Sequence, residues 1–314
     1  MSRIDPLGVR WILAAGLWLA GCATSPPPSG LPDSLDVSSR HELTEVPFFP
    51  QRDYQCGPAS LAMTLAWSGL KVTPEDLKPQ VYSAKREGSL PPDMIAAARR
   101  RGRIAYPVTS TADLLREVAA GHPVIVLQRL ESFWQTQWHY AVVIGYDLER
   151  REIVLHSGAE ERLAMALDAF EQTWKPWGYW GLVTMDPRRL PASAEPKKYV
   201  KAVLGLERTQ RWQEAEQAYS SALARWPHHL TAWIGLGNSR YALGNLAGAE
   251  QAFRSAVRAK PDSGIPYNNL AHVLMEMNRT EEALAVIRQA IRLGGPQISV
   301  YKKTLAEIQR RRNS

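Results

Sequence analysis

The chain has 314 residues, of which 45% are hydrophobic and 22% are charged, and its formal net charge is +7. This composition excludes a collagen-like or wholly disordered chain, and the length favours two domains over one. The basic residues are scattered except at Arg99–Arg103 and Arg310–Arg312, where no aromatic residues are interleaved. Since base-stacking surfaces need such aromatic residues, we expect solvated basic faces and no nucleic-acid partner.

The first segment is typical of a secretory signal peptide. Arg3 and Arg10 flank a polar start, and the apolar run Trp11–Ala20 that follows is too short to span a bilayer as a helix. A basic start, a short apolar segment and small residues predict a signal peptide over residues 1–21.

Leu19-Ala20-Gly21-Cys22 resembles the lipobox of bacterial lipoproteins, in which the cysteine is acylated and becomes the first mature residue. The resemblance implies a lipid anchor on Cys22, followed by a flexible tether over residues 22–43. Ala23 stands where lipoproteins of the inner membrane often carry aspartate. We therefore expect attachment in the cell envelope, at the outer membrane facing the periplasm. A disulfide between Cys22 and Cys56 is an alternative in an oxidising compartment.

Cys56 is predicted to open a helix. Val46–Pro50 is apolar and its prolines disfavour a helix, whereas Pro58 suits a first helical turn. Ala59–Trp67 supplies helix-forming and apolar residues, and Gly69 ends the helix. Free amides and the macrodipole at a helix N-terminus favour an anion and lower the pKa of a thiol. We therefore expect a nucleophilic Cys56, with a small buried hydrophobe as the alternative.

A general base for this nucleophile must come from a later segment. The segments that follow predict, in order, a helix, a buried strand, a polar aromatic loop and three further strands: Thr111–Ala120, Pro123–Leu127, Glu131–Trp138, His139–Tyr146, Arg151–Gly158 and Trp177–Val183. His139 is then the first residue of a core strand and lies beside a loop in which Trp134 or Trp138 could line a substrate groove. Taken alone, such a histidine is more often structural than catalytic.

Together these segments resemble the papain-like cysteine peptidases that remove double-glycine leaders from bacteriocins, and their stand-alone relatives. The resemblance rests on Gln51, on Cys56-Gly57-Pro58-Ala59 and on His139-Tyr140-Ala141-Val142-Val143. It implies an α+β domain over residues 44–187, built from an N-terminal helix and an antiparallel sheet. It also implies that Cys56 attacks, His139 is the base and Gln51 donates to the oxyanion. No metal-spaced cluster or phosphate-binding glycine loop occurs, so we expect no cofactor.

In this family the third catalytic residue, beside the cysteine and the histidine, is usually an aspartate that orients the imidazole and stabilises its charged form. Here His156 stands in its place, and a neutral histidine can accept a hydrogen bond but brings no negative charge. His156 or Ser157 could orient His139, a backbone carbonyl or another side chain could do so, or the peptidase could be impaired. We favour the first two together, because the nucleophile, the base and the oxyanion glutamine are all present.

The C-terminal part repeats every 34 residues, the period of tetratricopeptide repeats. Frames that start at Pro196, Leu230 and Gly264 align without gaps, with an aromatic residue at position four and alanine at positions 20 and 27. Small residues let paired helices approach closely, and larger residues fill the space between them. We therefore expect a linker over residues 188–196 and an all-α superhelix over residues 197–314, made of three repeats and a C-terminal cap helix.

The leading hypothesis is an envelope-anchored cysteine peptidase that hydrolyses peptide bonds through an acyl-enzyme on Cys56. Its repeats would recruit a peptide or protein substrate, or another protein partner, through their groove, although they could instead only stabilise the peptidase. The alternative is a catalytically impaired peptidase fold that binds peptides or proteins. A third reading has the same thioester chemistry acting on a non-peptide amide or transferring the acyl group to an amine.

Overall fold

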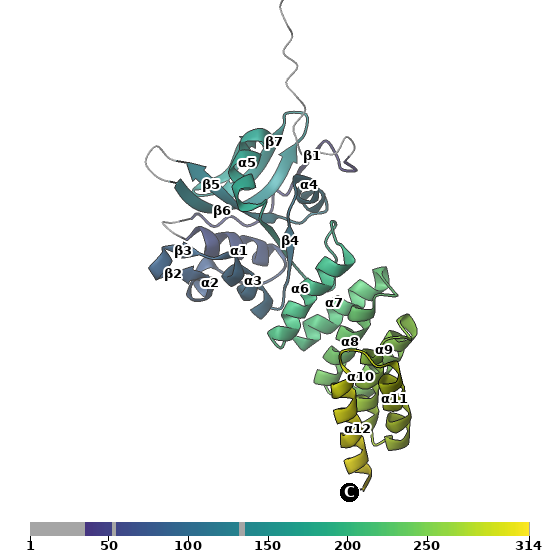
Figure 1. Cartoon of the computed structure of the whole chain (residues 1–314). Coiled ribbons are helices and arrows are strands. Elements are labelled where there is room, and N and C mark those ends of the chain that lie inside the picture. The colour runs from purple at the N-terminus through teal and green to yellow at the C-terminus, as the bar shows by residue number, and fades with distance from the viewer. Residues whose placement is uncertain (1–34, 52–54, 132–135, 314) are drawn as a thin grey trace, which may run out of the picture.

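The computed structural model describes residues 35–51, 55–131 and 136–313. The predicted signal peptide, Cys22 and most of the tether lie outside the described residues, as does Trp134. Figure 1 shows a sheet with helices on both faces, followed by a stack of antiparallel helices that carries the C-terminus. Within the described ranges, no helix is long and apolar enough to cross a membrane.

The N-terminal part is a sheet flanked by helices. Its strands are β1 Arg40–Glu42, β2 Tyr82–Ser83, β3 Gly88–Ser89, β4 Ile104–Val108, β5 Val124–Glu131, β6 Thr136–Asp147, β7 Glu152–Ser157, β8 Glu160–Ala166 and β9 Gly181–Met185. Its helices are α1 Cys56–Trp67, α2 Pro74–Val81, α3 Pro91–Arg100, α4 Thr111–Ala119 and α5 Leu167–Trp174, with single 3-10 turns at Ala84–Arg86 and Lys175–Trp177. Seven described strands form one antiparallel sheet in the order β4-β9-β5-β6-β7-β8, with β1 on β6. The predicted α+β architecture is confirmed.

The two faces of the sheet bury different cores, because successive side chains of a strand point to opposite faces. Tyr140 and Val142 of β6 pack with the residues of α1, α2 and α3. Ala141 and Val143 pack on the opposite side, with α4 and α5. This alternation decides which face each residue of the site belongs to.

Two predicted boundaries were wrong. β6 begins at Thr136, three residues before His139, because Glu131 and Thr136 already pair across the hairpin. The last strand begins at Gly181 and not at Trp177, since a 3-10 turn and the left-handed Gly178, with φ of 60°, interrupt the extended chain.

The C-terminal part consists of helix pairs. They are α6 Pro196–Arg208 and α7 Trp212–Arg225, α8 Leu230–Ala242 and α9 Leu246–Ala259, α10 Gly264–Glu276 and α11 Thr280–Leu293, and then α12 Ile298–Asn313. The first helix of each pair begins at the start of a predicted frame. Gly237 shows why small residues recur, because a Cβ atom there would lie 2.4 Å from the Phe253 ring. The predicted repeats are confirmed.

The two parts share one hydrophobic core. Tyr199 and Val203 of α6 belong to the same buried cluster as Tyr106 and Trp174 of the sheet domain. Figure 1 shows α6 lying against the sheet domain beside α3 and β4. The first repeat is therefore built onto the peptidase-like domain.

The connecting segment is held by a buried carboxylate. Glu117 of α4 is fully buried and accepts hydrogen bonds from His122 Nδ1 at 2.7 Å, from Ser193 N at 2.7 Å and from Ala192 N at 3.2 Å. Tyr106 donates its hydroxyl to the Ser193 carbonyl at 3.0 Å. The predicted linker thus forms specific contacts before α6 begins.

Candidate functional site

Cys56 is the first residue of α1, as predicted. The chain can begin a helix there because Pro58 suits the first turn and small residues follow. Gly57 allows close packing against β3, since a Cβ atom at this position would lie 2.2 Å from Ser89 Oγ. The start of α1, which packs closely on the β2–β3 hairpin, therefore fixes the position of the candidate nucleophile.

The Cys56 thiol lies against the main chain of β6. Burial raises its pKa, while the backbone amides of Tyr140, Gly57 and Cys56 itself act in the opposite direction. The expectation that the helix N-terminus would lower the pKa is wrong in sign here, because the loss of solvent outweighs the amide dipoles. The resting thiol is neutral at pH 7.

His139 is neutral at pH 7 as well. Burial lowers the pKa of its imidazole to about 4. Its Nε2 atom lies 3.0 Å from Ser157 Oγ at the end of β7. A serine supplies no negative charge to stabilise an imidazolium, so burial is not compensated.

Cys56 and His139 lie on either side of the Tyr140 main chain. α1 reaches the edge of β6 where β7 has ended, so the Tyr140 amide faces the thiol. By strand alternation the His139 ring leaves β6 on the face of Ala141, the face opposite to α1. Among the described residues, no hydrogen bond joins the thiol to the imidazole. The resting thiol and imidazole are therefore not engaged with each other.

Gln51 reaches the same stretch of β6. Its Nε2 atom donates to the Tyr140 carbonyl at 3.2 Å and to Ser60 Oγ at 3.3 Å. The main-chain amide of Gln51 donates to the Gly158 carbonyl at 2.9 Å, and this bond fixes the chain at Gln51 beside the end of β7. The predicted oxyanion donor therefore lies beside the candidate nucleophile, but its amide group must leave Tyr140 to serve a substrate.

His156 does not orient His139. Its Nε2 atom lies 3.1 Å from the Val46 carbonyl, and its Nδ1 atom is bonded to the Glu161 carbonyl. The ring also packs on Phe48, with centroids 5.2 Å apart. The prediction failed because adjacent residues of a strand face opposite ways, and Ser157 is the one on the His139 face.

Aromatic residues flank the thiol on the α1 face. Trp138 is 49% exposed, and its ring contacts Trp177 at a centroid distance of 4.0 Å. Tyr140 contacts Trp180 at 5.7 Å. Trp138 was predicted as a groove residue, whereas the roles of Trp177 and Trp180 depend on a tertiary contact that spacing does not reveal. This surface can pack against an extended peptide.

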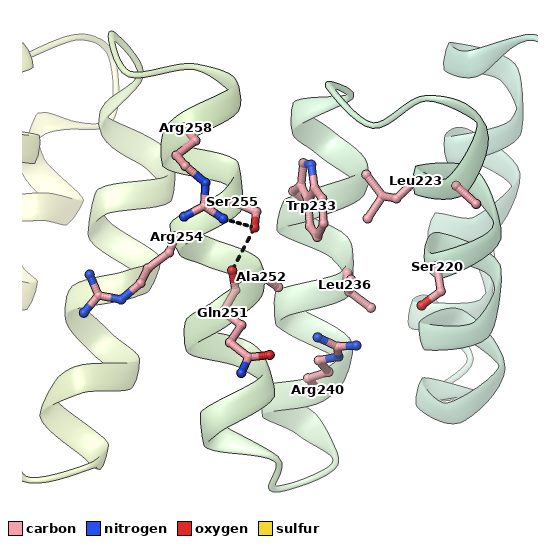
Figure 2. A pocket seen from close by; sticks show the side chains of 11 residues that line it. Ser220, Leu223, Trp233, Leu236, Arg240, Gln251, Ala252, Arg254, Ser255 and Arg258 are labelled. Atoms are coloured by element: carbon pink, nitrogen blue, oxygen red, sulfur yellow. Dashed lines mark hydrogen bonds between the residues drawn. The ribbon is translucent and has the colours of Figure 1, made fainter.

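A second candidate site lies in the repeats. A pocket of about 630 Å³ opens between α7, α8 and α9. Figure 2 shows Trp233, Leu236 and Arg240 on α8, with Leu223 of α7 on one side of them and Arg254 and Arg258 of α9 on the other. Arg240 pairs with Glu216 at 2.9 Å and Arg254 pairs with Glu250 at 2.8 Å, whereas Arg258 donates to Ser255 Oγ at 2.7 Å. The pocket therefore combines an apolar surface with the charge of Arg258.

Comparisons with known proteins agree with this division. Residues 43–181 match the Peptidase_C39 like family, and residues 200–264 and 241–308 match tetratricopeptide repeat families. A comparison with curated proteins found no match.

Solved structures resemble each part separately. A C39-like structure from Bacillus anthracis is 19% identical, with 46% of this chain and 97% of that chain covered and a TM-score of 0.38. The Yersinia enterocolitica type III secretion translocator chaperone SycD is 14% identical, with coverage of 38% and 86% and a TM-score of 0.35. The first tetratricopeptide repeat domain of Spaghetti (RPAP3), bound to an HSP90 peptide, is 15% identical, with coverage of 38% and 96% and a TM-score of 0.36.

Proposed function

Because the chain carries a C39-like peptidase domain followed by tetratricopeptide repeats, we propose that it is a cysteine peptidase that hydrolyses peptide bonds in the cell envelope. The observation that supports this most is that Cys56 and Gln51 both contact the main chain of Tyr140, the strand neighbour of His139 in β6. These three residue types supply a nucleophile, an oxyanion donor and a base.

The reaction would begin from a neutral pair. A substrate that lies along Trp138 would bring its carbonyl to Cys56, while His139 turns toward the thiol and accepts its proton. Catalytic hydrogen bonds are often long before substrate binds, so the resting separation is compatible with this step. The sulfur then attacks the carbonyl carbon, and the oxyanion receives hydrogen bonds from the Cys56 amide and from Gln51.

Hydrolysis would follow by the same groups in reverse roles. His139 gives its proton to the leaving amine, and the C–N bond breaks to leave a thioester on Cys56. Water, deprotonated by His139, attacks that thioester, and the C–S bond breaks to release the acid. His139 then returns the proton to the Cys56 thiolate. The hydrogen bond from Ser157 to Nε2 holds the imidazole at rest, and it would break as His139 turns toward the thiol.

The repeats would recruit the substrate or a second protein, since such arrays bind protein partners. The predicted acyl chain on Cys22 would hold the protein at the outer membrane facing the periplasm. The predicted tether would let the peptidase domain reach substrates away from the bilayer.

The test compares peptide cleavage by the full chain and by three variants. A peptide library is incubated with each protein, and new termini are identified by mass spectrometry. We expect cleavage by the full chain, none by Cys56→Ala, and a loss of about 10²- to 10⁴-fold in His139→Ala. Asp168→Asn, an exposed change elsewhere, serves as the control. Equal cleavage by all variants would refute the proposed nucleophile.

One observation favours a second candidate function. No described acid contacts His139, and burial keeps both His139 and Cys56 uncharged. A peptidase fold that binds peptides without cleaving them would show this pair. This second candidate function predicts that the Cys56→Ala variant still binds peptides and that neither the full chain nor any variant produces new peptide termini.

A further inference from the structure

Arg99 differs from the other arginines of the basic run Arg99–Arg103. The sequence favours a solvated face for this run, yet Arg99 lies in the crease where α3 meets α6. A Cβ atom at Gly205 of α6 would lie 2.1 Å from Arg99 Nε, so the guanidinium lies directly on the helix backbone. The absence of a side chain at Gly205 makes room for it.

Within the part of the chain that the structure describes, no acid pairs with Arg99. Its Nε atom is buried, and none of the described residues accepts a hydrogen bond from it. Burial and the nearby positive charge of Arg208 lower the pKa of Arg99. Buried charged groups are normally paired, because their desolvation is costly. A half-buried guanidinium beside a second cation is therefore an incomplete site.

Further cations lie on the same face of α6. Lys197, Lys201, Gly205 and Arg208 follow one another at spacings of four, four and three residues, which places them along one stripe of the helix. Lys197, Lys201 and Arg208 are exposed, and within the described ranges none of them forms an ion pair. Arg99 extends this stripe from the peptidase domain.

Three acids around this run and α6 are engaged elsewhere. Glu207 precedes Arg208, but its carboxylate is bonded to the Tyr219 hydroxyl on the other side of α6. Glu214 pairs with Arg211 at 3.8 Å, and Asp186 pairs with Arg188 at 2.8 Å. Arg240 and Arg254 of the repeat pocket provide the contrast, because both have acidic partners.

We propose that Arg99, Lys201 and Arg208 form a binding site for carboxylate groups of an acidic protein segment, at the junction of the peptidase domain and the first repeat. A bidentate carboxylate fits a guanidinium fork, and Arg99 and Arg208 present two of them. The crease between α3 and α6 favours a discrete side chain over a flat membrane surface. The site does not depend on peptidase activity.

The site can be tested by direct binding. The full chain carrying Cys22→Ser is titrated into fluorescein-labelled hexaglutamate, with labelled hexaglutamine as the uncharged peptide. We expect hexaglutamate alone to bind, Arg208→Glu and Arg99→Gln each to weaken it at least tenfold, and Arg288→Glu on exposed α11 to change it less than twofold. Because Arg208 is exposed, its variant should keep the full chain's thermal unfolding temperature.

Two results would overturn the proposal. One is hexaglutamate binding that Arg208→Glu and Arg99→Gln leave unchanged. The other is a failure of hexaglutamate to bind at all. Binding of the full chain to phosphatidylglycerol vesicles, with phosphatidylcholine vesicles as the uncharged control, then shows what the cations do. If Arg208→Glu selectively reduces binding to phosphatidylglycerol, the cations serve a membrane and not a protein segment.

Discussion

Replacing Ser157 by aspartate would restore the charge that the His139 environment lacks. Ser157 Oγ lies 3.0 Å from His139 Nε2. Opposite charges about 4 Å apart attract by about 4 kcal/mol at an effective dielectric constant of about 20, and about 1.4 kcal/mol corresponds to one pKa unit. After the cost of burying the carboxylate, we expect the pKa of His139 to rise from about 4 to about 6 in Ser157→Asp.

The measurement is an NMR titration of the His139 ring, assigned by its absence in His139→Gln. In a Cys22→Ser background, iodoacetamide then reports on Cys56 alone, and we expect about tenfold faster labelling at pH 7 in Ser157→Asp. Ser157→Asn is the control, because it can hydrogen-bond but adds no charge. An unchanged His139 pKa in Ser157→Asp, or an equal rise in Ser157→Asn, would refute the electrostatic reasoning.

Three further predictions concern stability, its dependence on pH, and turnover. Glu117→Gln should lower the free energy of unfolding by about 2–4 kcal/mol in urea, because an amide cannot accept from all the donors that surround this carboxylate. Hydrogen bonds lower the pKa of Glu117 despite burial, so the stability that Glu117 contributes is present at neutral pH and is lost as the pH falls through the folded-state pKa. A Glu117→Gln protein whose loss in free energy of unfolding is as large in acid as at neutral pH would contradict this. Gly237→Ala should cost about 1–3 kcal/mol by crowding Phe253, against almost no loss in Thr231→Ala at an exposed position, and equal melting temperatures would argue against the close approach. His156→Ala should slow turnover less than His139→Ala, and equal, complete loss in both would give His156 a catalytic role.

Periodicity predicted the repeat helices well. Each frame combines small and large residues at fixed positions, so Gly237 and Phe253 define a helix pair without any distant information. The start of α1 followed in the same way from Pro58 and the small residues after it. The repeat helices and the start of α1 depend on residues that are close together in the sequence, so the sequence alone predicts them.

The environment of the site could not be predicted in this way. Strand alternation places Ser157 and not His156 beside His139, and that depends on a register that β6 and β7 fix only on pairing. The pKa of Cys56 depends on its burial in the folded domain and on the amide of Tyr140, which lies 84 residues later in the chain. Arg99 belongs to a basic run, and only the contact with Gly205 distinguishes it from its neighbours.

The central claim is that Cys56 forms a thioester with the help of His139. The most direct measurement is intact-protein mass spectrometry after acid quench, with a peptide that the full chain cleaves. The account predicts an added acyl mass on Cys56, which forms about 10²- to 10⁴-fold more slowly in His139→Ala and not at all in Cys56→Ala. Cleavage that proceeds in Cys56→Ala, or acylation at the full rate in His139→Ala, would contradict it.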